Sequence, residues 1–223
     1  IVFIFQPGEE IGAGAKVCAP IIKEKKIQRI YAFHNWSGFP EKSVIVRKGL
    51  IHCPSMGVTF RFQGEQAHAS QPEDGNNPSV AIAEFVSQVM ATMDAYKEKE
   101  GISEDPLTFG TIVGVKVGNS DFGIAPGEGE VSLTLRSSME IHMHGICQAL
   151  EKLAGEISRK YDLAYQTEWS DVFPETVNDP ALAKEVLDRA EEMGLMTREL
   201  EDPIRSSEDF GYFQKECPGV IFF

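Results

Sequence analysis

Short apolar runs separated by amphipathic stretches dominate the first quarter of the chain. The continuous apolar run IVFIF at residues 1–5 predicts a strand that is covered on both faces. An amphipathic stretch over about 14–25 predicts a helix, and the runs RIYAFHN (29–35) and SVIVRKG (43–49) predict two more strands. Strands that alternate with helices indicate an α/β fold with a mostly parallel sheet.

The middle of the chain changes to strict alternation. In GVTFRFQG, Val58, Phe60 and Phe62 alternate with polar residues, which is typical of a strand with one buried face. Two stretches keep the spacing of one apolar helix face, around 82–93 and 146–157. Further strands are expected at 109–118, 130–137 and 163–169. The order β-α-β-β-α-β is the ferredoxin-like arrangement, in which two helices cover one sheet face and the other face stays polar.

The last part of the chain returns to the style of the first. A helix is expected over 180–194, followed by a helix and a strand within 206–223. The simplest architecture is an α/β domain formed by residues 1–54 and 171–223, interrupted by an inserted module at 55–170. Because the chain starts and stops inside predicted strands, we expect a sequence truncated at both ends.

Composition narrows the class of protein. With 34 acidic against 21 basic residues the net charge is −13, which disfavours binding to nucleic-acid phosphates. The four cysteines form no CxxC pair and are expected to be free thiols in a reducing compartment. No apolar stretch approaches the roughly 20 residues that span a bilayer, and the apolar start is too short for a signal peptide. We therefore expect a cytoplasmic protein that binds neither nucleic acid nor membrane.

Two adjacent glutamates follow the first predicted strand. Glu9 and Glu10 come directly after a Pro-Gly turn, at the strand end where open α/β sheets place their ligands. A purely structural role is the alternative, in which their negative charges stabilise the N-terminus of the next helix through its dipole. His34 ends another predicted strand, and the ends of neighbouring parallel strands meet in one crevice. Carboxylate and imidazole together suit Zn²⁺ or Mn²⁺, with one glutamate free to serve as a base.

The inserted module contributes two further candidates. His68 lies in GEQAHASQP among small residues, so nothing local buries it, and the structural alternative is an idle surface histidine. Arg136 is in phase with Ser132 and Thr134 on its strand and is expected to point from the polar face.

Five motifs occur in a familiar order and at familiar spacings: FIFQPGEE, HNW, GEQAHASQP, EVSLTLR and SSEDFGYF. Together they resemble the family of two-metal amidohydrolases that contains aminoacylases, hippurate hydrolases and auxin-conjugate hydrolases. The resemblance extends over essentially the whole chain. Each motif alone is weak, but five in the right order favour a functional interpretation of the two glutamates.

The resemblance implies a role for each candidate. The first glutamate of the pair is the general base in such enzymes, which implies Glu9 as the base. The second glutamate and the histidine that ends the next strand are metal ligands, which implies Glu10 and His34. His68 is similar to a histidine that contacts the substrate carbonyl, often from the partner subunit, and Arg136 to an arginine that holds the substrate carboxylate.

The resemblance leaves one role undefined and departs from the family pattern in two places. Glu208 matches the late acidic motif and is expected to bind near the substrate, with a less defined role. Gly123 replaces an asparagine of the family, whose hydrogen bond Asn119 could supply. Further metal ligands, expected upstream of the glutamate pair and downstream of the last strand, are not among these 223 residues. Two divalent ions, Zn or Mn, are therefore expected in the intact enzyme, with an incomplete site in this chain.

The resemblance predicts metal-dependent hydrolysis of an amide bond in an N-acyl amino acid or a small peptide-like substrate. Residues 1–54 and 171–223 would form the catalytic domain, and residues 55–170 a lid that forms a homodimer through an open edge strand. Because His68 and the metal ligands lie in different domains, closure is expected for turnover. Two alternatives stay open: a non-catalytic fragment or ferredoxin-like binding module, and a peptidase or carbamoyl-amide hydrolase of the same family.

Overall fold

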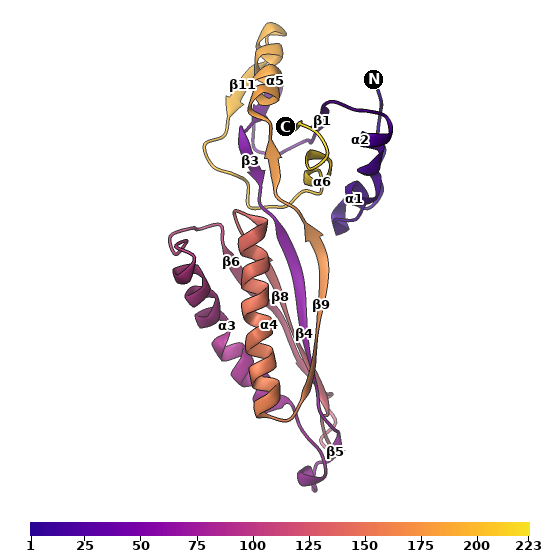
Figure 1. Cartoon of the computed structure of the whole chain (residues 1–223), viewed down its shortest axis with the longest axis vertical. Coiled ribbons are helices and arrows are strands. Elements are labelled where there is room, and N and C mark those ends of the chain that lie inside the picture. The colour runs from indigo at the N-terminus through magenta and orange to yellow at the C-terminus, as the bar shows by residue number, and fades with distance from the viewer. The chain divides into compact units, whose positions relative to one another are not determined.

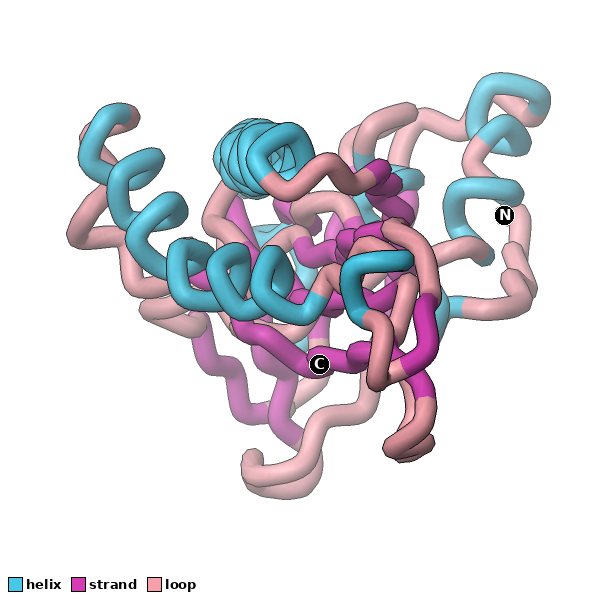
Figure 2. Tube along the Cα trace, turned by 90° about the horizontal axis from the view of Figure 1, so that it is seen from below, coloured by secondary structure: helices cyan, strands magenta, loops and turns pink.

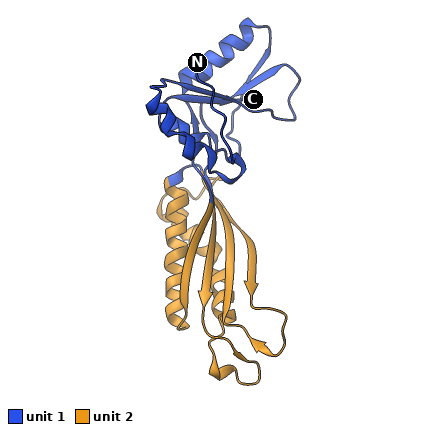
Figure 3. Ribbon diagram, turned by 90° about the vertical axis from the view of Figure 1, so that its right-hand side faces the viewer, with its two compact units in different colours: residues 1–55, 138–140, 171–223 blue, residues 56–137, 141–170 orange.

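A computed structural model describes all residues, 1–223, and the chain divides into two compact units (Figure 3). Unit 1 comprises residues 1–55, 138–140 and 171–223. Unit 2 comprises residues 56–137 and 141–170. Each unit is therefore assembled from segments that are distant in the sequence.

Strand pairs of both directions form the framework of unit 1. Parallel pairs join β1 (Ile30–Phe33) to β12 (Gly219–Phe222) and β2 (Ser43–Val46) to β11 (Met196–Glu199), and an antiparallel pair joins β3 (Gly49–His52) to β10 (Thr176–Asn178). Ile45 and Phe223 exchange two backbone hydrogen bonds, of 2.7 and 2.8 Å, so the end of the chain also contacts β2. The fold is mixed α/β: the parallel pairs were expected, whereas the antiparallel pair was not.

Helices of unit 1 follow the sequence signals closely. The helix predicted over 14–25 is divided into α1 (Gly14–Cys18) and α2 (Pro20–Glu24), because Pro20 interrupts the hydrogen-bond ladder. Helix α5 (Pro180–Glu192) begins after Asp179, whose carboxylate accepts two backbone N–H bonds of 2.9 Å, and α6 is the single turn Gly211–Gln214.

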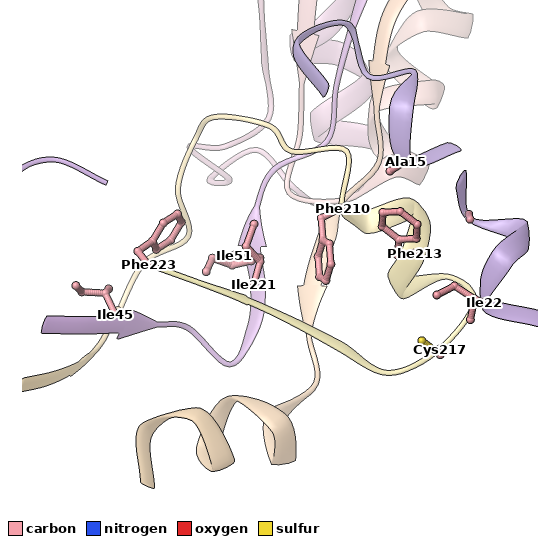
Figure 4. Packing of buried hydrophobic residues seen from close by; sticks show 10 residues of the cluster. Ala15, Ile22, Ile45, Ile51, Phe210, Phe213, Cys217, Ile221 and Phe223 are labelled. Atoms are coloured by element: carbon pink, nitrogen blue, oxygen red, sulfur yellow. The ribbon is translucent and has the colours of Figure 1, made fainter. Parts of the chain in front are cut away.

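A buried apolar cluster joins these elements (Figure 4). It draws side chains from α1, α2, α6, β2, β3 and the end of the chain: Ala15, Ala19, Ile22, Ile45, Ile51, Phe210, Phe213, Cys217, Ile221 and Phe223. The segment that follows the late acidic motif is thereby fixed against the helices that follow the glutamate pair.

The strand predicted at residues 1–5 is wrong. These residues form no strand, and the chain beside the N-terminus is drawn as loop in Figure 2. Phe3 and Phe5 are 78% and 92% exposed. A strand needs a neighbour to accept its backbone hydrogen bonds, and no segment of this chain pairs with this run.

Unit 2 is built around a four-stranded sheet. Its strands are β4 (Ser55–Gln63), β6 (Phe109–Val117), β8 (Glu128–Arg136) and β9 (Ala164–Phe173), in the spatial order β6-β8-β4-β9. The long helices α3 (Ser79–Lys99) and α4 (Glu140–Lys160) run alongside these strands (Figure 1). None of the helices in the chain is both long and apolar enough to cross a bilayer.

The two faces of this sheet differ as the alternation predicts. On β8, Val131, Leu133 and Leu135 are buried, whereas the intervening residues are only half-buried. On the buried face, Phe60 of β4 packs on Phe85 of α3, with ring centroids 4.9 Å apart. A small antiparallel pair, β5 (Ala67–His68) with β7 (Ile124–Ala125), and the 3-10 turn η2 (Pro72–Asp74) complete the unit.

Candidate active site

The glutamate pair lies on a single 3-10 turn, η1 (Glu9–Ile11). Gly8 and Gly12 flank the turn with φ of 64° and 66°, in the left-handed region that favours glycine. A Cβ on Gly12 would also lie 2.8 Å from the carbonyl oxygen of Val172. The turn therefore needs glycine at this position both for its backbone angle and for the close approach of Val172. It leaves Glu9 half-buried and Glu10 exposed.

Glu9 belongs to a cluster of three carboxyl groups. Oxygen atoms of Glu9, Glu208 and Asp209 all lie within 4.8 Å of one another, and the last two residues are 8% and 0% exposed. Burial, followed by the charges of Glu9 and Asp209, raises the pKa of Glu208 to about 8. This shift favours the protonated form of Glu208, whose hydroxyl donates a hydrogen bond to the Glu9 carboxylate.

The environment of Glu9 suits a base. Burial first, and the nearby charge of Asp209 second, raise its pKa above the ordinary value, while the hydrogen bond from Glu208 acts in the opposite direction. A carboxylate with a raised pKa accepts a proton more readily than a solvated surface glutamate.

Asp209 connects this cluster by hydrogen bonds to the residues on either side of the glutamate pair. Its Oδ1 accepts a hydrogen bond from Nε2 of Gln6, and its Oδ2 accepts one from the backbone N–H of Ala15, both at 2.8 Å. The late acidic motif is thereby connected to both sides of the turn that carries Glu9.

His34 lies directly after β1, where its backbone N–H donates to the carbonyl of Phe222 at 3.0 Å. Its Nδ1 is 2.8 Å from the carbonyl oxygen of Asn35. A carbonyl only accepts, so Nδ1 carries the proton and Nε2 presents a lone pair. An exposed imidazole held in this tautomer has the form of a metal ligand. Neither His34 nor Glu10 belongs to the group of three carboxyls within 4.8 Å.

His68 is held in the opposite tautomer. It lies on β5, paired with Ile124 of β7, and its ring is exposed. The backbone N–H of Ser70 donates to Nδ1 at 3.2 Å, and Oγ of Ser70 lies 2.7 Å from the same nitrogen. Nδ1 is therefore an acceptor, so the neutral ring carries its proton on Nε2, where it can donate to an incoming oxygen atom.

Arg136 ends β8 on the half-buried face of the sheet, in phase with Ser132 and Thr134 as predicted. His68 and Arg136 belong to unit 2, whereas Glu9, Glu10, His34 and Glu208 belong to unit 1.

Comparison with known proteins identifies the family. The model of peptidase family M20/M25/M40 matches residues 1–223. The chain belongs to this family. The resemblance inferred from the five motifs is thus confirmed.

Two curated relatives of this M20 chain are named as deacetylases. The N-acetyldiaminopimelate deacetylase of Shouchella clausii is 30% identical over 226 residues, which cover 100% of this chain and 59% of the relative. The N-acetylcysteine deacetylase of Bacillus subtilis is 25% identical over 223 residues, which cover 98% of this chain and 56% of the relative. The chain thus spans less than two thirds of the length of these relatives.

Solved structures share the fold of this M20 chain. The YXEP protein of Bacillus subtilis, described as a dinuclear metal-binding peptidase of the M20 family, matches with a TM-score of 0.70 at 22% identity, over 99% of this chain and 54% of that one. An aminobenzoyl-glutamate utilization protein of Klebsiella pneumoniae matches with a TM-score of 0.75 at 18% identity, over 98% of this chain and 55% of that one. At these identities the likeness establishes the fold alone.

Sequence reasoning on this M20 chain missed two residues in unit 1. Asp209 directly follows Glu208 in the quoted motif SSEDFGYF, and its acidic side chain was the available signal. His52 is 2% exposed, and its Nε2 has no hydrogen-bond partner although Nδ1 lies 3.2 Å from Oγ of Ser206. Nothing in the local pattern GLIHCPS distinguishes a buried histidine from an exposed one.

Gly123, which stands where the family has an asparagine, and Asn119, which could supply the same hydrogen bond, both lie in unit 2. Asn119 lines a cavity of about 280 Å³ together with Lys116 and Asp121. Gly123 accepts a hydrogen bond from the backbone N–H of Ala69 at 2.9 Å, so its carbonyl helps to hold the loop that follows His68.

Proposed function

We propose that this M20 chain provides the base and part of the metal site of an amide hydrolase that acts on N-acyl amino acids or small peptide-like compounds. The observation that carries the proposal is the contact between the carboxyl groups of Glu9 and the buried Glu208, in the cluster that Asp209 completes. The names of the deacetylase relatives support an N-acyl amino acid as the substrate.

Glu10 and Nε2 of His34 are the residues that would hold divalent ions, Zn²⁺ or Mn²⁺. The fit is chemical: an exposed carboxylate and an imidazole with a fixed lone pair are ligands that both metals accept. Two such ions, as in the dinuclear neighbour, would lower the pKa of a water molecule and polarise the amide carbonyl.

Glu9 acts as the general base in this proposal. Its carboxylate accepts a proton from the attacking water, and the same oxygen passes that proton to the leaving amine nitrogen. Glu208 would lie against the substrate as well as against Glu9, and its proton would keep a second negative charge away from the reacting carbonyl.

His68 and Arg136 would contribute from unit 2. The Nε2–H of His68 would donate to the oxyanion that develops on the amide carbonyl, a contact that typically contributes about a hundredfold or more in rate. Arg136 would hold the substrate carboxylate in a bidentate pair and so orient the scissile bond. In this proposal residues 55–170 act as a lid.

The lid is also the proposed homodimer surface. The element order β4-α3-β6-β8-α4-β9 and the strand order β6-β8-β4-β9 support a ferredoxin-like lid. In that order β6 is an edge strand, and its Val115 is 51% exposed. Edge strands offer unpaired backbone groups to a second copy.

The family match over the whole chain does not favour a non-catalytic binding module. A peptidase or carbamoyl-amide hydrolase would use the same groups on a different leaving group, and a panel of N-acetyl amino acids, dipeptides and N-carbamoyl amino acids separates these three substrate classes. Cytoplasmic location is part of the proposal and is supported by the four free cysteines.

Glu9→Gln tests the assignment of the base. The amide cannot accept the proton of water, so we expect hydrolysis of N-acetyl amino acids to fall about a thousandfold or more. Zn²⁺ or Mn²⁺ content after removal of excess ion should stay within about twofold, because Glu10 and His34 are unchanged. A Glu9→Gln variant with ordinary turnover and ordinary metal content would contradict the role of Glu9.

A further inference from the structure

The glutamate pair stands on a turn with little stability of its own. η1 has no side-chain cap and no buried residue, and the hydrogen bonds of such short 3-10 turns have poor geometry. Gly8 and Gly12 on either side are free to adopt other backbone angles in the absence of outside contacts. Contacts from another part of the chain must therefore fix the direction of Glu9 and Glu10.

Asp209 makes such contacts on both sides of the turn. Gln6, which donates to Oδ1, precedes the turn, and Ala15, which donates to Oδ2, follows it. One carboxylate therefore bridges the two ends of the segment 6–15. Asp209 is fully buried, so water does not compete for these bonds, and bonds to a charged acceptor are the stronger kind. The backbone N–H of Asp209 also donates to the Glu9 carboxylate.

The location of Asp209 is electrostatically unfavourable in itself. Its negative charge lies beside Glu9 and Glu208, and it raises the pKa of both. An apolar side chain of similar size would fill the same space without that repulsion. Stability of the core alone therefore does not account for an aspartate here, whereas the two bonds to the ends of the segment do.

We infer that Asp209 is a positioning residue that holds the turn carrying Glu9 and Glu10 by bridging Gln6 and Ala15. The inference rests on the proposed function, because it acts through the base assigned there. Direct binding of a cation by Asp209 is the competing role. Both of its oxygens already accept N–H bonds, which leaves each oxygen one further lone pair for a cation.

Asp209→Ala removes both bonds, and Asp209→Asn tests whether they are what matters. In the asparagine variant Oδ1 can still accept from Ala15, and Nδ2 can donate to Gln6 once the Gln6 amide turns its oxygen toward it. At saturating metal we expect Asp209→Ala to lower kcat about 100-fold with KM within about threefold, because a shift of about 1 Å in a catalytic group has that effect. Asp209→Asn should recover kcat to within about tenfold of the parent.

Hydrogen exchange supplies a readout that does not depend on activity or metal. In the metal-free protein, the backbone amides of Gly12, Gly14 and Ala15 should exchange at least about tenfold faster in Asp209→Ala, and near the parental rate in Asp209→Asn. Asp179→Ala is the matched control: it also removes an aspartate that accepts two N–H bonds in unit 1, at the start of α5. It should change neither kcat nor exchange around Gly12.

The outcomes separate the inference from the function on which it rests. If no variant or parent hydrolyses any amide, the proposed function fails, and the exchange data still decide the role of Asp209. Unchanged exchange around Gly12 in Asp209→Ala would overturn the inference. So would an Asp209→Asn variant as inactive as Asp209→Ala that has also lost bound metal, because that pattern requires a charged ligand.

Discussion

Glu9 and Glu208 come from opposite ends of the chain, yet one donates a hydrogen bond to the other. Two carboxylates cannot share such a bond unless one of them holds a proton. Burial assigns the proton to Glu208, which is the less exposed of the two. The motif containing Glu208 could be found in the sequence, but its protonation depends on burial that only the folded chain creates.

The buried side chain of His52 makes the stability of the protein depend on pH. Burial, more than any other cause, lowers the pKa of His52 to about 4, against about 6.5 in the unfolded chain. As pH falls below 6.5 the unfolded chain takes up a proton that the folded chain refuses, so stability decreases between pH 6.5 and 4, by at most about 3 kcal/mol. Urea unfolding of the parent and of His52→Gln between pH 7.5 and 4.5 measures this difference.

We expect the stability of His52→Gln to fall less steeply over that interval, since glutamine does not titrate. His68→Gln, which changes an exposed histidine, is the matched control and should follow the parent. Parallel curves for the parent and His52→Gln would show that His52 is not buried in its neutral form.

At the scale of elements, the sequence predicts a helix or strand correctly where the residues that stabilise it are neighbours in the chain. Asp179 followed by Pro180 marks the start of α5. The Asp179 side chain accepts hydrogen bonds from free N–H groups of the first turn, and Pro180 has no N–H that needs a partner. The run at 1–5 has an equally clear pattern, but a strand also needs a partner, and pairing is not a local property. The antiparallel pair of β3 with β10 was missed for the same reason.

Gly12 shows how one element depends on the approach of another. Gly12→Ala should lose about 1–2 kcal/mol of unfolding free energy from its φ of 66°, with a further loss because the new Cβ would lie 2.8 Å from the carbonyl oxygen of Val172. Displacement of the Glu9 turn should also lower kcat about tenfold or more. Urea unfolding and amide hydrolysis measure the two effects.

Gly194→Ala is the matched control for this variant. Gly194 has a φ of 73° and nothing within 4 Å of its added Cβ, so it carries the backbone strain without the collision. Equal losses of stability in the two variants, with kcat unchanged in both, would mean that Val172 does not constrain the turn.

At the scale of the whole molecule, the sequence predicted an inserted module because the periodicity changes near residue 55 and again near residue 170. The structure contains two compact units, and each of them is assembled from segments that are not contiguous in the sequence. The residues proposed for catalysis are divided between them, so no single stretch of the chain contains the proposed chemistry. Self-association of unit 2 is a property at this scale that the fold of one copy does not determine.

Val115→Lys tests the proposed homodimer. Val115 is 51% exposed on β6, one of the two edge strands of the sheet, and a lysine there places a charge in any surface buried between two such edges. We expect the parent to scatter light as a dimer at micromolar concentration and Val115→Lys to shift toward the monomer mass. Val17→Lys, at a 75% exposed position on α1 in unit 1, makes the same chemical change and should leave the dimer intact. A monomeric parent, or a dimer that survives Val115→Lys, would rule out β6 as the surface through which two copies of unit 2 associate.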